Sequence, residues 1–217
     1  MKIILYIFLA SLCLISCDRT QCKDGLDLLP MYGKEIKCKK QIEKDNRFLA
    51  SCDTQYPSRK EASEDMLRFA WKHYVNGDID MAMKRFNQAW LLDSLNADIY
   101  LGYGEIMLDE KKFDESLIYF NKSIELNPQN AEAYKFSGVA YSSLFDSTSD
   151  QKYLDKSIEQ IKKSIEINPE KAGTFALLTN IYSQYSQQDS ARKYLKITDK
   201  MNPDLIKSEV RERILKK

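Results

Sequence analysis

The feature that most constrains this chain is a pattern of apolar and small residues that recurs about every 34 residues. Residues 97–130 show the unit best: an apolar segment up to Asp109, a short polar break, and a second apolar segment from Phe113 to Pro128. The helical spacing of the apolar residues predicts two helices joined by a tight turn. Such a pair cannot bury its apolar face alone, so successive pairs must stack. The sequence therefore predicts an all-α solenoid.

The unit occurs four times in succession, at residues 63–96, 97–130, 131–171 and 172–205. Small residues recur at one position of each first helix and one position of each second helix, which allows the two helices to approach closely. These residues are Ala70, Gly104, Gly138 and Thr179, and then Ala82, Ser116, Ser157 and Ala191. The third unit is longer, with its excess at residues 145–150. This excess predicts either a longer loop or extended helices.

The spacing resembles the tetratricopeptide repeat (TPR), in which an aromatic residue, Leu-Gly, Tyr, Ala, Phe and Pro stand at fixed intervals. The second unit matches with Tyr100, Tyr103-Gly104, Met107, Ser116, Phe120 and Pro128. The resemblance implies a right-handed superhelix of four helix-turn-helix repeats. Segments 34–62 and 206–217 are expected to cap its ends, because an open solenoid end exposes an apolar face. In the second cap the predicted apolar stripe is Ile206, Val210 and Leu215.

In TPR proteins the first helix of each pair lines a concave groove that holds a peptide or a partner's helix. The resemblance therefore implies a protein-binding function. It places the following residues in the groove: Leu67, Trp71, Tyr74, Leu101, Glu105, Leu108, Lys135 and Asn180. One known use, clamping the acidic tail of a heat-shock chaperone, needs polar groups where Leu67 and Trp71 stand, and is excluded.

The helix expected around residues 66–75 is apolar on nearly all sides, so it must be covered on two sides. One possible cover is segment 34–51, folded back as a helix. The other is a client peptide anchored on Trp71 and Tyr74. Just before this helix, Ser58 and Glu61 match a capping box.

The N-terminus has the features of an export signal. Residues 1–16 combine a basic start with an uncharged apolar run that is too short to span a bilayer. The sequence Leu14-Ile15-Ser16-Cys17 resembles a bacterial lipobox, which implies cleavage before Cys17 and acylation of that residue; an ordinary signal peptide is the alternative. Residues 17–33 are predicted to be the lipidated Cys and a tether.

The lipobox resemblance implies a lipid-anchored protein of the bacterial cell envelope. We expect it on the periplasmic face of the outer membrane. Asp18, next to the acylated residue, leaves the choice between inner and outer membrane open.

Three cysteines remain after lipidation: Cys22, Cys38 and Cys52. An oxidising compartment permits one disulfide among them. If segment 34–51 is one unbroken helix that reaches Cys52, then Cys38 and Cys52 lie about 21 Å apart, too far for a disulfide. Any pair must then include Cys22. The alternative is three unpaired thiols.

The composition argues against several classes of function. The chain has 33 basic and 32 acidic residues, whereas nucleic acids require a basic surface. His73 is the only His, and the sequence has no Gly-rich phosphate loop and no paired Cys spacing. We therefore expect no enzymatic activity, no metal or cofactor, and neither nucleic acid nor a small-molecule substrate as ligand.

The leading hypothesis is a membrane-anchored scaffold that docks protein partners during assembly or maintenance of an envelope complex. The alternative is an accessory lipoprotein that stimulates a peptidoglycan or secretion enzyme. The lipobox and the repeats are compatible with both.

Overall fold

The computed structural model describes residues 22–185 and 187–216, and in these the chain forms ten α-helices, three short 3₁₀ helices and no strand. The predicted signal peptide and Cys17 lie outside the described residues. The α-helices are α1 (Lys39–Gln55), α2 (Arg59–Val75), α3 (Ile79–Leu92), α4 (Ala97–Asp109), α5 (Phe113–Leu126), α6 (Ala131–Thr148), α7 (Gln151–Ile167), α8 (Ala172–Gln184), α9 (Gln188–Met201) and α10 (Ser208–Leu215). The 3₁₀ helices are η1 (Leu26–Leu28), η2 (Pro30–Lys34) and η3 (Pro203–Leu205).

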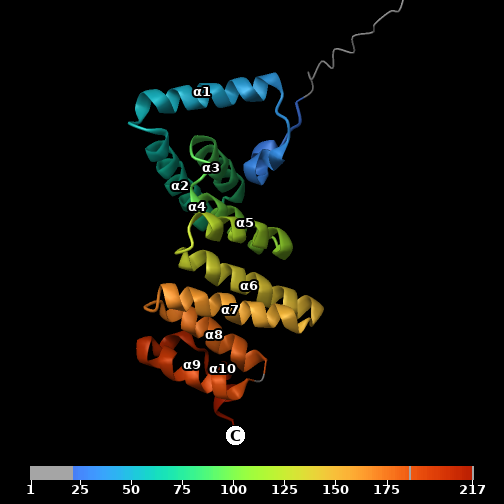
Figure 1. The fold of residues 1–217 in the computed structure, drawn as a ribbon, viewed down its shortest axis with the longest axis vertical. Coiled ribbons are helices and arrows are strands. Elements are labelled where there is room, and N and C mark those ends of the chain that lie inside the picture. The colour runs from blue at the N-terminus through green and yellow to red at the C-terminus, as the bar shows by residue number, and fades with distance from the viewer. Residues whose placement is uncertain (1–21, 186, 217) are drawn as a thin grey trace, which may run out of the picture.

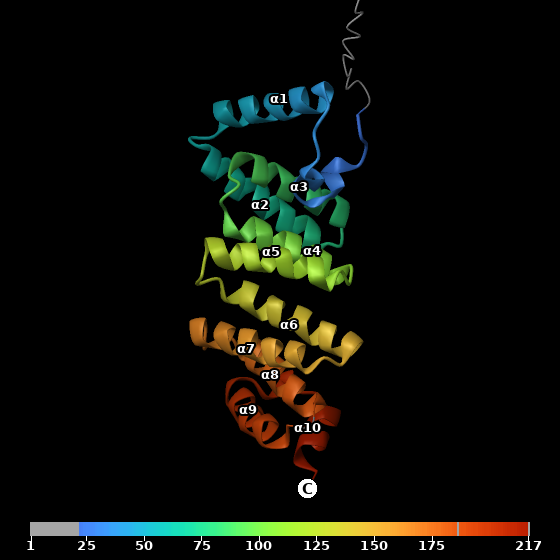
Figure 2. The same ribbon diagram turned by 45° about the vertical axis from the view of Figure 1, so that its right-hand side comes forward.

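Helices α2 to α9 pack as four successive pairs, α2 with α3, α4 with α5, α6 with α7 and α8 with α9. The pairs stack in one column between α1 at one end and α10 at the other (Figures 1 and 2). The first pair begins at Arg59, four residues before the unit boundary drawn from the sequence. As predicted, Ser58 caps α2: its side chain accepts a hydrogen bond from the backbone N–H of Glu61.

The extra residues of the third unit lengthen its helices. Helices α6 and α7 contain 18 and 17 residues, compared with 13 and 14 in α4 and α5. Of the two possibilities left open by the sequence, helix extension is therefore the one observed.

Small residues allow the paired helices to pack closely. A Cβ atom on Gly104 would overlap the ring of Phe120, which is fully buried. In the third pair, the hydroxyl of Ser157 donates a 2.8 Å hydrogen bond to the carbonyl of Gly138. These contacts explain why small side chains recur at these positions of the repeat.

The predicted tether is wrong for residues 22–33. Residues 22–38, which we call the N-terminal arm, fold back onto α3, where η1 and η2 pack. The side chains of Leu26, Met31 and Tyr32 are buried. The amide of Asn87 on α3 donates to two arm carbonyls, those of Asp27 at 3.0 Å and Leu29 at 2.9 Å. Residues 22–33 are therefore part of the fold rather than a spacer.

The predicted helix over residues 34–51 is wrong in its bounds. Helix α1 starts at Lys39, because Lys34 has a φ of +55° and Cys38, the N-cap, is extended. Cys38 therefore lies outside the helix, where it forms a disulfide with Cys22, with a Cα–Cα distance of 5.2 Å. Cys52 is buried and forms no disulfide with another described residue. The disulfide therefore includes Cys22, as predicted from the sequence.

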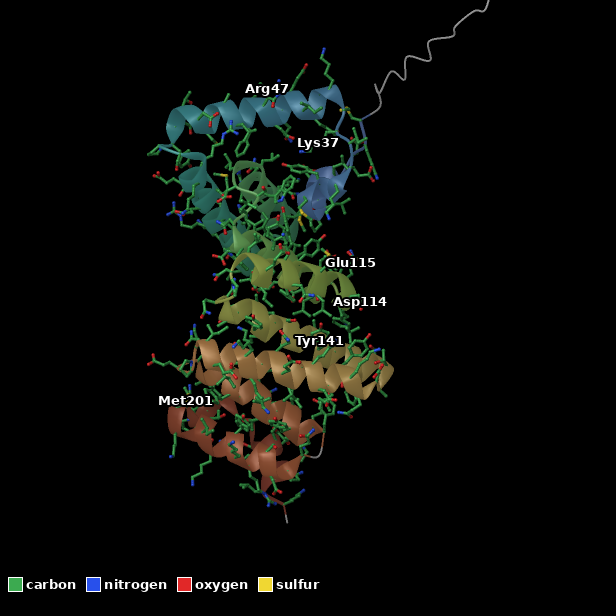
Figure 3. All side chains as sticks on the ribbon, in the orientation of Figure 1. Lys37, Arg47, Asp114, Glu115, Tyr141 and Met201 are labelled. Carbon is green, nitrogen blue, oxygen red and sulfur yellow. A yellow bond between two sulfur atoms is a disulfide. The ribbon has the colours of Figure 1, made fainter. Side chains whose placement is uncertain are left out.

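Helix α1 lies across the end of the column (Figures 1 and 3). Its inner side adds Phe48, Leu49 and Cys52 to the core formed by α2 and α3. The hydroxyl of Tyr56, directly after α1, donates a 2.8 Å hydrogen bond to Asp65 on α2. Arg47 is exposed on the outer side of α1 (Figure 3). The chain itself thus supplies part of the cover that the apolar helix α2 needs.

At the other end, α10 packs against α8 and α9. Ile206 and Ile214 are buried, whereas Leu215 is 59% exposed, so the predicted apolar stripe is wrong at Leu215. Ile214 lies four residues after Val210 and therefore on the same face of α10, which packs on the core, whereas Leu215 lies five residues after it. Within the described part of the chain, no helix combines the length and apolar character needed to cross a membrane.

Candidate partner-binding face

The first helices of successive pairs are linked side by side by polar contacts. The hydroxyl of Tyr74 on α2 donates a 2.6 Å hydrogen bond to Asp109 on α4. Further along, the hydroxyl of Tyr185, the residue after α8, donates a 2.5 Å bond to Asp146 on α6. We call this side the first-helix face. It carries the sequence-predicted groove residues Leu67, Trp71, Tyr74, Leu101, Glu105, Leu108, Lys135 and Asn180 on α2, α4, α6 and α8.

The apolar residues of this face differ in how much of their surface is exposed and therefore accessible to a partner. Leu67 and Leu101 are 6% and 7% exposed, so they serve the protein's own core. Trp71 is half-buried, and its ring meets those of Phe86 and Tyr74 edge-on at centroid distances of 5.2 and 5.6 Å. Leu108 is also half-buried. A partner can therefore contact Trp71, Tyr74 and Leu108 without displacing the core.

The centre of the face is acidic. Burial raises the pKa of Glu105 to about 7; the Lys135 ammonium opposes this rise, while the carboxylates of Glu132 and Asp109 add to it. The pKa of the Tyr74 phenol is raised by burial and by its hydrogen bond to Asp109. Lys135, the cation that faces Glu105, is paired with Glu132 and lies 4.1 Å from the ring centroid of Phe136. Among the described residues of this cluster, neither Glu105 nor Asp109 therefore forms an ion pair with a basic side chain.

The far end of the face is partly closed by the chain itself. Arg213 of α10 donates a 2.8 Å hydrogen bond to the hydroxyl of Ser183 on α8. One turn before Ser183, the side-chain oxygen of Asn180 is shielded from solvent and lacks a hydrogen-bond partner among the described residues. The cluster around Glu105, which is formed by α2, α4 and α6, lies away from this closed end.

Two of the eight predicted residues, Leu67 and Leu101, belong to the core, and Tyr74, Glu105 and Lys135 meet in one cluster. The prediction missed Glu132, which neighbours Glu105. Its position, second in the third unit, is also acidic in the first two units, with Glu64 and Asp98, and this recurrence could have indicated it. Among the described residues, no group of His, Cys, Asp and Glu side chains is placed to hold a metal ion.

Comparisons with known proteins agree with this architecture. The tetratricopeptide repeat family matches residues 97–130, the second of the four helix pairs. A comparison with curated proteins gives no match. The likeness over more of the chain comes from solved structures.

Three solved structures resemble the chain. TTC0263, a thermophilic TPR protein of Thermus thermophilus, is 18% identical with a TM-score of 0.59, over 70% of this chain and 79% of that one. YrrB, described as a TPR protein with an unusual peptide-binding site, is 17% identical with a TM-score of 0.56, over 77% and 87%. PilF of Pseudomonas aeruginosa is 14% identical with a TM-score of 0.57, over 75% and 71%. At these identities the likeness concerns the fold alone, and that fold is an all-α solenoid of the tetratricopeptide-repeat type.

Proposed function

We propose that this protein is a membrane-anchored scaffold whose first-helix face binds a peptide segment of a partner protein. The observation that carries the proposal is the cluster of Trp71, Tyr74, Glu105 and Asp109, which joins a half-buried aromatic pair to carboxylates without a cation of their own. Aromatic side chains are enriched among the few residues that contribute most of the binding energy of a protein–protein interface. YrrB, which shares the fold, has a peptide-binding site according to its description.

The chemistry of the cluster favours a basic partner segment. A Lys or Arg side chain placed between Glu105 and Asp109 would give both carboxylates a counter-ion, and a charge-assisted hydrogen bond is about twice as strong as a neutral one. The aliphatic stem of the same side chain could pack on Trp71. Its charged group, if it lies near the aromatic face, would add a cation–π attraction. An acidic segment would be repelled at the same place.

The location that we propose rests on the N-terminal sequence. The lipobox-like Ser16-Cys17 supports acylation of Cys17 and residence in the bacterial envelope, most simply on the periplasmic face of the outer membrane. Several acyl chains on one residue would hold the protein stably on a bilayer. The Cys22–Cys38 disulfide suits an oxidising compartment outside the cytosol. The proposed role is docking of a partner during assembly or maintenance of an envelope complex.

The test is crosslinking and affinity purification from intact envelopes with Cys17 retained. The native chain is compared with a Glu105→Gln, Asp109→Asn double variant and with Glu159→Gln, which changes an exposed carboxylate on α7. We expect one stoichiometric partner with the native chain and the α7 control, and its loss with the double variant. Equal recovery with all three proteins contradicts binding at this face. Recovery of a peptidoglycan or secretion enzyme instead of assembly subunits would favour the accessory role.

A further inference from the structure

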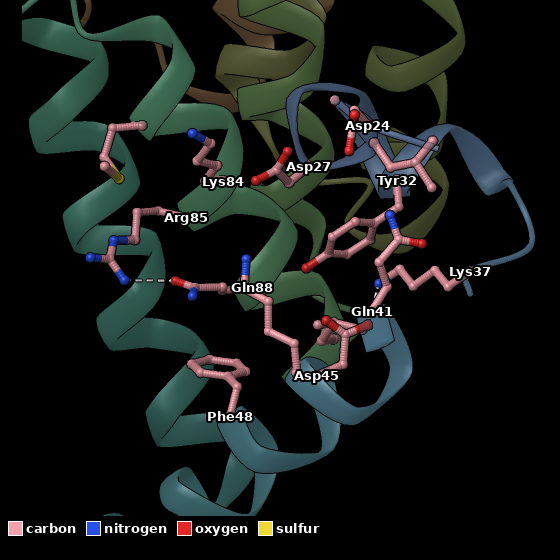
Figure 4. Close-up of a pocket in the computed structure, with 15 residues that line it drawn as sticks. Asp24, Asp27, Tyr32, Lys37, Gln41, Asp45, Phe48, Lys84, Arg85 and Gln88 are labelled. Carbon is pink, nitrogen blue, oxygen red and sulfur yellow. Dashed lines mark hydrogen bonds and ion pairs between the residues drawn. The ribbon is translucent and has the colours of Figure 1, made fainter. Parts of the chain in front are cut away.

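A second site lies away from the first-helix face, in a cavity of about 310 Å³ between the N-terminal arm, α1 and α3 (Figure 4). None of the residues that line it belongs to the first-helix face. Its volume is at the lower end of the range for small-molecule sites, about 300–1,000 Å³. It could therefore hold a compact ligand, and nothing in the proposed scaffold function accounts for it.

The walls of this cavity are held in place by the protein itself. Asn87 fixes the arm to α3 through the carbonyls of Asp27 and Leu29. The side-chain amide of Gln41 on α1 donates a 2.7 Å hydrogen bond to the carbonyl of Lys23 in the arm. The Cys22–Cys38 disulfide ties the start of the arm to the residue that precedes α1. A ligand would enter a preformed site and would not have to order the arm, which favours affinity.

The α3 wall is basic and has unused hydrogen-bond donors. Lys84 and Arg85 both reach the cavity, and among the ion pairs of the described residues neither takes part. One terminal nitrogen of Arg85 donates a 2.7 Å bond to Gln88, and its Nε is shielded from solvent without an acceptor in the described part of the chain (Figure 4). The shielded Nε is closed to a ligand as it is to solvent. A carboxylate in the cavity would instead pair with the rest of the Arg85 guanidinium, which lines the cavity and has no anionic partner in the described part of the chain.

The arm wall carries the opposite charge. Asp24 and Asp27 line the cavity from the arm, and no ion pair in the described part of the chain includes them (Figure 4). From α1, Lys44 also lines the cavity, whereas Asp45 is already paired with Lys37. A ligand ammonium group would match the two arm carboxylates. Apolar side chains complete the lining: Leu26, Phe48, Met81 and Leu91.

We propose that this cavity binds a short zwitterionic peptide of two or three residues. Its carboxylate lies at Lys84 and Arg85, its ammonium group at Asp24 and Asp27, and its small apolar side chains on Phe48 and its apolar neighbours. A phosphate or another simple anion would satisfy the α3 wall but would face the arm carboxylates. A neutral apolar molecule would leave both charged walls without partners.

Isothermal titration calorimetry on the oxidised full chain tests this assignment with three probes. They are L-alanyl-L-alanine, its N-acetyl derivative, which lacks the ammonium group, and its C-terminal amide, which lacks the carboxylate. We expect binding of the free dipeptide at one site, and affinity at least about tenfold lower for each blocked form, since each loses one charged contact. Absence of heat with the free dipeptide overturns the proposal. Equal affinity for the acetylated form reduces the site to an anion site and also overturns it.

Variants of the wall residues then test whether the dipeptide binds in this cavity. Arg85→Gln and Asp27→Asn should each weaken dipeptide binding about tenfold or more. Arg47→Gln, the same substitution on the outer side of α1, should leave it unchanged (Figure 3). Thermal unfolding shows whether each variant folds, and Lys84→Gln replaces Arg85→Gln if that variant does not. Dipeptide binding that is unaffected by any of the wall variants lies elsewhere and contradicts the assignment.

Discussion

The hydroxyl of Tyr74 on α2 lies 2.6 Å from a carboxylate oxygen of Asp109 on α4, 35 residues away in the sequence. This bond crosses from one helix pair to the next and fixes both side chains beside Glu105. An aromatic hydroxyl and two carboxylates thereby occupy one place on the first-helix face. The behaviour of Glu105 in this setting leads to two predictions.

The affinity of the first-helix face for a basic peptide should fall as the pH drops below about 7. The pKa of Glu105 is about 7, so the carboxylate that attracts a cation is mostly protonated below this pH. A Lys-containing peptide titrated at about pH 6 and about pH 8 should bind several-fold more weakly at the lower pH. Glu105→Gln should remove the difference. An unchanged pH profile in this variant would mean that another group titrates.

Glu105→Gln should also stabilise the protein at high pH. The carboxyl has its ordinary pKa of 4.5 in the unfolded chain and about 7 in the folded one, so the folded state binds more protons between these values and its stability falls as pH rises through that window. Above the folded pKa the loss is complete. The variant, which does not ionise, should gain of order 1–3 kcal/mol over the native chain at about pH 8 and show little gain at about pH 4. Urea unfolding at both pH values measures the difference.

Trp71→Ala should destabilise the protein and not only weaken peptide binding. The Trp71 ring meets the fully buried Phe86 edge-on, so its removal leaves a void in the first pair. We expect a loss of about 2–4 kcal/mol in the free energy of unfolding. Leu108→Ala, at a half-buried position of α4, should cost less and is the better probe of binding. A thermal midpoint for Trp71→Ala equal to that of the native chain would contradict this packing role.

Glycine substitutions at two helical positions should have opposite effects. A Cβ on Gly104 would overlap the Phe120 ring, whereas a Cβ on Gly173 of α8 meets no atom within 4 Å. Gly104→Ala should therefore cost about 1–3 kcal/mol through overpacking. Gly173→Ala should gain about 0.5 kcal/mol, because it restricts the unfolded chain. Denaturant unfolding of the pair distinguishes close helix contact from a general effect of alanine.

Asn87→Ala should release the N-terminal arm. The Asn87 amide bonds the carbonyls of Asp27 and Leu29, and its oxygen accepts a 2.7 Å hydrogen bond from the hydroxyl of Tyr103. Asn87 is fully buried, so its removal leaves several groups unsatisfied and should cost about 2–4 kcal/mol. Compared with the native chain, the variant should show faster hydrogen exchange of the amide protons in residues 22–34. The exchange of the amide protons in α8 should be the same in both proteins. Unchanged protection of the arm would show that the disulfide and the buried side chains suffice to hold it.

The repeated helix pairs could be predicted from the sequence because their determinants are local. Gly104 and Phe120 stand at fixed places of one unit, and the same spacing returns in every unit, so periodicity alone indicates which side chains meet. The cap at Ser58 could be predicted for the same reason, since both partners lie within four residues.

The arm could not be predicted in the same way. Met31, Tyr32, Gly33 and Lys34 all have positive φ, a conformation that no periodic pattern indicates. The arm's main partner, Asn87, lies about 60 residues further along and occupies an ordinary polar position of the repeat. The acidic cluster was predicted in part: Glu105 and Lys135 came from the repeat register, whereas the pKa of Glu105 depends on burial that the register does not report.

The disulfide between Cys22 and Cys38 would determine which end of the column lies nearest a membrane. If Cys17 carries the acyl chains, five residue steps separate the lipid from a residue bonded to the start of α1, a leash of at most about 18 Å. Only the α1 end of the column would then be held close to the lipid headgroups. The end that carries α10 would stay free to point away from the bilayer, toward partners at a distance from it.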